Sequence, residues 1–91
     1  LRSLRKLSLL MRTSGVVYAL REILTALDDD EKYGVVLRAK GIVPAENGTW
    51  LHFDHVPGEI DVRTGTAAVT GRLCVIGSGL KTDALTALFG V

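Results

Sequence analysis

The stretch Tyr33-Gly34-Val35-Val36-Leu37-Arg38-Ala39-Lys40-Gly41-Ile42-Val43 decides how this chain folds, because it is apolar, rich in β-branched residues and contains two cations. This composition is typical of a β-strand. With a period of two, one face carries Tyr33, Val35, Leu37 and Ala39, and the other carries Val36, Arg38 and Lys40. We therefore predict a strand with one face in the core and with Arg38 and Lys40 side by side on the opposite face.

Length and composition indicate one small folded domain. The chain has 91 residues, enough for a single core of two layers, and 47% of them are hydrophobic, well above the composition of a disordered segment. Its apolar runs are shorter than the roughly 18 residues of a membrane span. The net charge of +1 gives no general attraction to nucleic acid, and the single cysteine, Cys74, fits a reducing, cytoplasmic compartment. Because the chain begins at Leu1 without Met, we expect it to be a piece of a longer protein.

The first third of the chain predicts one helix between two less regular segments. The apolar residues of segment 1–13 fit both the spacing of a helix and the alternation of a strand. We interpret this segment as a linker or an edge strand that follows a missing upstream domain. Thr13-Ser14 then offers a cap for a helix whose apolar residues recur at helical spacing up to Leu27. The acidic run Asp28-Asp29-Asp30-Glu31 opposes the helix dipole, so the helix should end near Leu27. We interpret that run as a solvated connection, because it lacks the alternate spacing and turn glycine of a calcium loop.

The remaining residues predict strands followed by a closing helix. Turn signals at Asn47-Gly48 and Pro57-Gly58 separate segments of alternating polarity, and the expected elements are strands over 49–56, 59–64 and 72–77 and a helix over 82–89 capped by Thr82. The strand over 72–77 is apolar on both faces, as an interior strand is. We therefore predict an α+β domain over residues 14–91, with a mainly antiparallel sheet of four to five strands and two helices packed on one face.

The segment His52-Phe53-Asp54-His55 contains two imidazoles and a carboxylate, which are common metal ligands. In a strand, however, residues three apart point to opposite faces, so His52 and His55 should diverge. His52 and Asp54 share a face, but two ligands are too few for a zinc site. We therefore predict no metal site, and His52, Asp54 and His55 remain the candidates for a weak metal-binding module.

Trp50 completes the candidate contact surface formed by Arg38 and Lys40, if the hairpin register brings it to the same face. It would then stack on the Arg38 guanidinium, anchor a protein interface, or pack in a partly buried position. A surface of this kind also fits a small domain that binds single-stranded nucleic acid, although the near-neutral charge and the scarcity of aromatic residues argue against it. No catalytic arrangement emerges, because Gly77-Ser78-Gly79-Leu80-Lys81-Thr82 lacks the spacing of a phosphate loop.

A collinear series of motifs resembles the C-terminal domain of CobW-type GTPases, known for cobalamin synthesis and metal delivery. The series comprises the aromatic-Gly and Arg-Ala-Lys-Gly pattern within residues 33–41, then Gly48-Thr49-Trp50 with His52-Phe53, then Pro57-Gly58, and finally residues 72–77 before the closing helix. It covers about residues 14–91. Several motifs that follow one another in the order of the family identify it more specifically than any one motif does.

This resemblance implies an upstream GTPase domain with a phosphate loop, magnesium ligands and a metal-binding Cys-x-Cys-Cys segment, none of which occurs in these 91 residues. It implies GTP, magnesium and a transition metal, zinc or cobalt, for the parent protein, with no cofactor and no enzymatic activity in this fragment. The implied role is a regulatory module that docks on the GTPase domain, on a metalloprotein client or on a second subunit. The short apolar runs give no reason to expect a membrane among its partners. Arg38 and Lys40 would belong to that docking surface.

Overall fold

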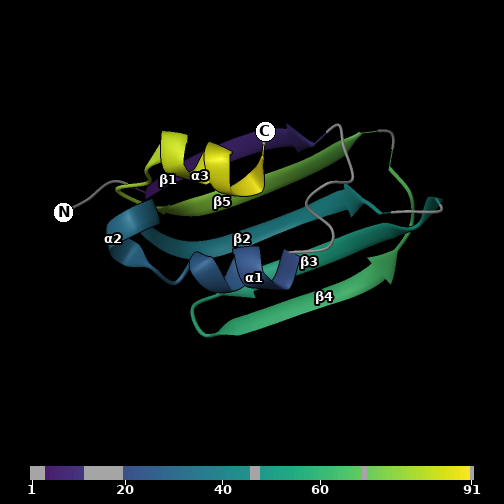
Figure 1. The fold of residues 1–91 in the computed structure, drawn as a ribbon, viewed down its shortest axis with the longest axis horizontal. Coiled ribbons are helices and arrows are strands. Elements are labelled where there is room, and N and C mark those ends of the chain that lie inside the picture. The colour runs from purple at the N-terminus through teal and green to yellow at the C-terminus, as the bar shows by residue number, and fades with distance from the viewer. Residues whose placement is uncertain (1–3, 12–19, 46–47, 69, 91) are drawn as a thin grey trace.

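A five-stranded antiparallel sheet forms one layer of the described part of the chain, and helices cover one of its faces (Figure 1). The computed structural model describes residues 4–11, 20–45, 48–68 and 70–90. The strands are β1 (Leu4–Met11), β2 (Val35–Pro44), β3 (Trp50–Val56), β4 (Glu59–Gly65) and β5 (Gly71–Ser78), and the helices are α1 (Leu20–Ala26), α2 (Asp30–Tyr33) and α3 (Thr82–Phe89). The predicted α+β class is confirmed.

The strands lie in the order β1-β5-β2-β3-β4, and every neighbouring pair is antiparallel. Strand β5 is therefore interior, with β1 on one side and β2 on the other. The expectation that both of its faces are covered is wrong, because Arg72 is exposed and Cys74 is half-buried on the open face. Residues Leu4–Met11, for which the sequence predicts a linker or an edge strand, form the edge strand β1. The boundary predicted between residues 1–13 and the domain over 14–91 stays a prediction.

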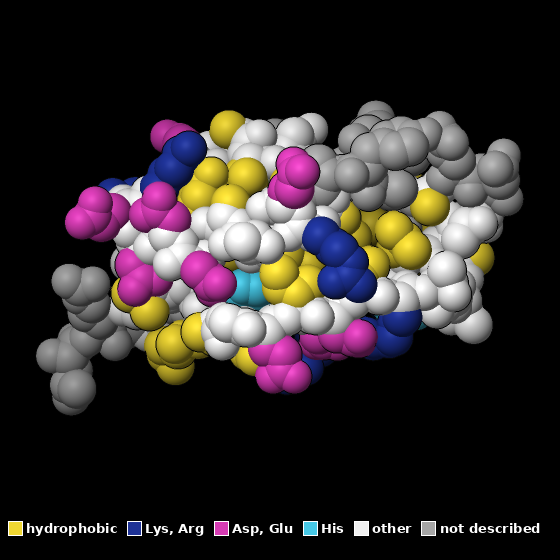
Figure 2. All heavy atoms as spheres, turned by 60° about the horizontal axis from the view of Figure 1, so that its bottom comes forward, with side chains coloured by type: hydrophobic (Ala, Val, Ile, Leu, Met, Phe, Trp, Pro, Cys, Tyr) yellow, Lys and Arg dark blue, Asp and Glu magenta, His cyan; other side chains and the backbone are white. Residues whose placement is uncertain are grey.

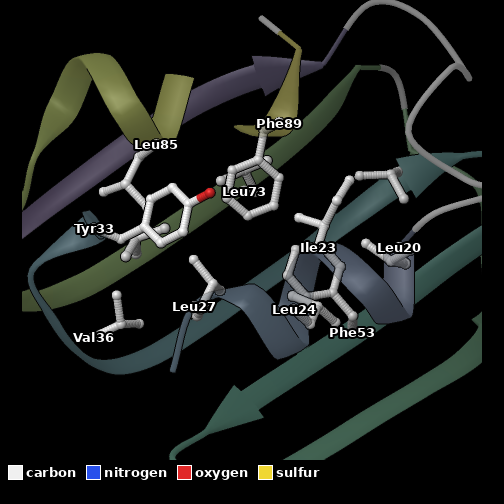
Figure 3. Close-up of a cluster of buried hydrophobic side chains, with 13 residues drawn as sticks. Leu20, Ile23, Leu24, Leu27, Tyr33, Val36, Phe53, Leu73, Leu85 and Phe89 are labelled. Atoms are coloured by element: carbon white, nitrogen blue, oxygen red, sulfur yellow. The ribbon is translucent and has the colours of Figure 1, made fainter. Parts of the chain in front are cut away.

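The core lies between the helices and the inner face of the sheet (Figure 3). Helix α1 contributes Leu20, Ile23 and Leu24, and helix α3 contributes Leu85 and Phe89. These side chains pack over buried residues of the strands, which are Val36, Ala39, Val43, Phe53, Leu73 and Val75. The alternation predicted for β3 is confirmed, because Phe53 and His55 face this core while His52 and Asp54 face away.

The phase predicted for the first half of β2 is wrong. Val36 is buried at 2% exposure, whereas Leu37 is 43% exposed. The pairing between β2 and β5 shifts between Val36 and Arg38, so the strand contains a β-bulge there. An extra residue in a strand reverses the alternation on one side of the bulge. Val36 and Ala39 therefore both face the core, and Arg38 and Lys40 still face outward.

The helices differ from prediction mainly at their ends. Helix α1 ends at Ala26, close to the predicted Leu27, while its predicted start at Thr13-Ser14 lies outside the described residues. The acidic run does not form only a loop, because Asp29 accepts a hydrogen bond from the Lys32 amide and caps the single turn α2. Its carboxylates remain exposed, and Figure 2 shows acidic side chains gathered at the end that carries α2.

Helix α3 spans Thr82–Phe89, as predicted, but Thr82 is not its cap. Lys81 occupies that position, without a side-chain hydrogen bond to the helix, and Thr82 is the first helical residue. Gly90 ends the helix in a left-handed conformation at φ 73°, which glycine adopts without steric cost. No helix among residues 20–45, 48–68 and 70–90 has the length and apolar character needed to cross a membrane.

Candidate functional site: the outer face of the sheet

The outer face is the side of the sheet opposite the helices, and no described helix covers it (Figure 1). It contains an open hollow of about 600 Å³. The outward side chains that line it come from all five strands, namely Lys6, Ser8, Leu10, Arg38, Lys40, Ile42, His52, Asp54, Arg63, Arg72 and Cys74. A sheet with one buried and one open face requires this alternation of apolar and polar residues.

The register of the strands aligns these residues in rows across the sheet. Lys40 lies opposite Cys74 on one side and Asp54 on the other, and Cys74 in turn lies opposite Ser8. The next row along contains Arg72, Ile42 and His52, and the row on the other side contains Ile76 with Lys6 and Arg38 on either side of it. Side chains of one row and of adjacent rows are close enough to act on one ligand.

Arg38, one of the two predicted cations, does not stand free on this face. Its Nη2 donates a hydrogen bond of 3.1 Å to Asp54 Oδ1, and Arg63 Nη2 lies 3.4 Å from Asp54 Oδ2. Arg63 also pairs with Asp61 on its own strand. Partial burial raises the pKa of Asp54, but the hydrogen bonds and positive charges of Arg38 and Arg63 outweigh burial and lower that pKa below its ordinary value.

Trp50 shares the outer face with His52 and Asp54, because residues two apart in a strand point the same way. It does not stack on Arg38. Ala39 pairs with His55, so Arg38 is level with Val56, six residues from Trp50 along β3. That separation is about 20 Å at the rise of an antiparallel strand. Trp50 therefore lies at one end of the outer face, opposite Pro44, and Arg38 lies at the other.

The three candidate metal ligands do not converge. His52 lies on the outer face with its Nε2 2.9 Å from the Thr66 carbonyl oxygen, and Asp54 is held by the two arginines. His55 is fully buried on the inner face, where its Nε2 is 3.2 Å from Asp28 Oδ1. No group of three or more His, Cys, Asp or Glu residues suited to hold a metal occurs in the part of the chain that the structure describes.

His55 Nε2 lies close to Asp28 Oδ1, but the two groups are not aligned as in a hydrogen bond. Within the described residues, both ring nitrogens of His55 lack a hydrogen-bond partner although the side chain is 0% exposed. Asp28 is 42% exposed at its side chain. His55 therefore belongs to the core under the end of α1, and it has no access to a ligand on the outer face.

Sequence reasoning did not predict that Lys6, Arg72 and Cys74 share the outer face with Lys40. A signal for Lys6 was present, because Leu7 and Leu9 alternate with Lys6, Ser8 and Leu10 as in a half-buried strand. Arg72 and Cys74 alternate in the same way with Leu73 and Val75. What the sequence does not contain is the register that joins β1 and β2 to β5.

The fold and this face define a class of small α+β domain in which helices cover one side of an antiparallel sheet and leave the other side open. The chain belongs to the family described as the cobalamin synthesis protein cobW C-terminal domain, whose model matches residues 9–91. The resemblance found in the sequence motifs is thereby confirmed. The comparison with curated proteins gives no match.

Two similar solved structures are zinc-bound forms of the YjiA GTPase. A triple mutant of that GTPase has a TM-score of 0.70 at 17% identity, and the E. coli protein has a TM-score of 0.69 at 18% identity. At this identity the likeness concerns the fold alone. In both cases the match covers 96% of this chain and 29% of the other, so the present chain spans less than a third of those GTPases.

Proposed function

We propose that this chain is the accessory C-terminal domain of a CobW-type, GTP-binding metal chaperone of the cytoplasm, and that its outer face docks onto a partner. The partner is the upstream GTPase domain of the same chain, a metalloprotein client or a second subunit. GTP hydrolysis, magnesium and the transported zinc or cobalt belong to the parent protein. The fragment itself carries no catalytic step in this proposal.

The observation that carries the proposal is the open, cation-bearing outer face. Arg38 has a side chain that is 54% exposed, and Lys40 is exposed beside it on the same strand. The family membership and the GTPases among the solved structures support a parent of this type. A GTPase segment that changes its order upon hydrolysis would alter its contact with such a face, which is how nucleotide state is passed to neighbouring domains.

The test is charge reversal in the full-length protein. Arg38→Glu combined with Lys40→Glu should weaken client binding or change GTP turnover, and Trp50→Ala tests the far end of the same face. Arg21→Glu, an exposed position on α1 at the opposite side of the sheet, is the matched control. If the double variant retains both client binding and GTP turnover, docking through this face is excluded.

A further inference from the structure

We infer that the outer face recognises an acidic polypeptide segment, and that Lys6, Lys40 and Arg72 hold it rather than Arg38. The inference rests on the proposed docking function and specifies the chemistry of the partner. It also shifts the main contact from Arg38 on β2 toward Lys40 and toward strands β1 and β5, where Lys6 and Arg72 lie.

The charges of the outer face are distributed unevenly between its strands. The adjacent strands β1, β5 and β2 contain no acidic residue, whereas β3 and β4 contain Asp54, Glu59 and Asp61. Arg38 and Arg63 are compensated by two carboxylates, those of Asp54 and Asp61. In the described ranges, no carboxylate oxygen lies within 4.0 Å of the charged nitrogens of Lys6, Lys40 or Arg72, so their charges are uncompensated.

These three cations surround one point of the sheet. Cys74 is the direct neighbour of Lys40, Arg72 lies two residues before it on the same strand, and Lys6 pairs with Ile76 two residues after it. From strand geometry, the Cα atoms of Lys40 and Arg72 are about 8 Å apart, and those of Lys40 and Lys6 about 12 Å. Carboxylates two residues apart on an extended peptide are separated by about 7 Å. An acidic segment of a few residues therefore spans this group of cations.

The hollow is also partly apolar. Leu10 is 58% exposed in it, and Ile42 is half-buried beside Arg72. Like charges placed close together on a surface of low polarity repel each other, and an opposite charge brought by a partner relieves that repulsion. The best partner therefore combines two or three carboxylates with at least one apolar side chain.

A polypeptide fits these features better than a nucleic acid does. A phosphate chain that crosses from Lys40 toward β4 would meet Asp54 and then Asp61, which lies directly opposite Asp54. The hollow also offers little for base stacking among the described residues, because Phe53 is only 1% exposed and faces the core, which leaves His52 as the one ring in its lining. Side-chain carboxylates, in contrast, can be spaced to reach the cations and to avoid the aspartates.

The test measures binding of a fluorescein-labelled synthetic peptide of alternating Glu and Val by fluorescence anisotropy, with the Gln and Val peptide as the reference. Each of Lys6→Gln, Lys40→Gln and Arg72→Gln should weaken binding of the Glu peptide by about two- to fivefold, as expected for an exposed ion pair. Arg21→Gln should leave it unchanged. Thermal unfolding of every variant shows whether the fold is retained.

Cys74 gives a second, local measurement, because it is the single cysteine of the chain. Alkylation of its thiol should be slowed several-fold by the Glu peptide and not by the Gln peptide. If both peptides bind equally, if neither binds, or if oligo(dT) protects Cys74 better than the Glu peptide does, the inference is wrong.

The full-length protein separates this inference from the proposed function. If Arg38→Glu with Lys40→Glu abolishes client binding while Lys6→Gln with Arg72→Gln has no effect, docking stands and the acidic-segment inference falls. If neither pair of substitutions has an effect, both fall. A loss of client binding with both pairs supports both.

Discussion

Asp54 is the residue that decides how much free positive charge the outer face presents. It accepts hydrogen bonds from Arg38 and Arg63, and these interactions lower its pKa. Because the pKa is lower in the folded protein than in the unfolded chain, ionised Asp54 stabilises the fold above a pH of about 4. That stabilisation is lost as the pH falls through the lowered pKa.

We therefore expect Asp54→Asn to reduce the free energy of unfolding at pH 7 by no more than about 1 kcal/mol, because all the partners are exposed to solvent. Below a pH of about 4 the difference from the natural chain should shrink as Asp54 becomes protonated. Urea unfolding at both pH values measures this. Asp54→Asn should also strengthen binding of the Glu peptide, and weaker binding would contradict our account of the face.

His55 leads to a different prediction, since it is buried without a hydrogen-bond partner among the described residues. Burying a polar group without a partner costs about 1–3 kcal/mol. His55→Leu should therefore be as stable as the natural chain or more stable, whereas His55→Ala should lose about 2–4 kcal/mol through the cavity it leaves. A strongly destabilised His55→Leu would mean that the contact with Asp28 matters, and Asp28→Asn would then show the same loss.

At the scale of single elements, the bulge in β2 explains which predictions failed. Period-two alternation correctly predicted the faces of β3, and it correctly predicted that Arg38 and Lys40 face outward. It assigned Val36 and Leu37 to the wrong faces. The bulge arises from the pairing of β2 with β5, and the local sequence pattern of β2 does not indicate it. Lys6 and Arg72 were missed for a related reason, since only the register joins them to Lys40.

The bulge can be tested with a pair of substitutions. Val36→Ala should lower the free energy of unfolding by about 2 kcal/mol, because Val36 is buried, whereas Leu37→Ala should change it by less than about 1 kcal/mol although it removes more atoms. Chemical denaturation compares the two directly. If Leu37→Ala lowers the free energy of unfolding more than Val36→Ala does, the strand follows the uninterrupted alternation predicted from the sequence and has no bulge.

At the scale of the whole molecule, strand β1 determines whether the sheet is complete. Leu7 and Leu9 pack against the core, and all eight residues of β1 pair with β5. Removing residues 1–11 should therefore lower the free energy of unfolding by more than about 2 kcal/mol, because apolar surface is lost and the apolar strand β5 becomes an edge.

The matched control is Leu10→Ser on the same strand, which faces the outer side and is 58% exposed. It should change stability by less than about 0.5 kcal/mol. Circular dichroism during thermal unfolding compares the variants. A truncated chain as stable as the 91-residue chain would mean that residues 1–11 act as a linker.

The strand order also has a kinetic consequence. The ladder between β1 and β5 joins Met11 to Gly71 and Leu4 to Ser78, which are 71 − 11 = 60 and 78 − 4 = 74 positions apart in the chain. Contacts between such distant positions close large loops, and proteins dominated by them fold in about milliseconds to seconds. During synthesis on the ribosome, β1 emerges before the other strands of this sheet but cannot pair until β5 has followed, so Leu7 and Leu9 stay in contact with water until β5 has been made.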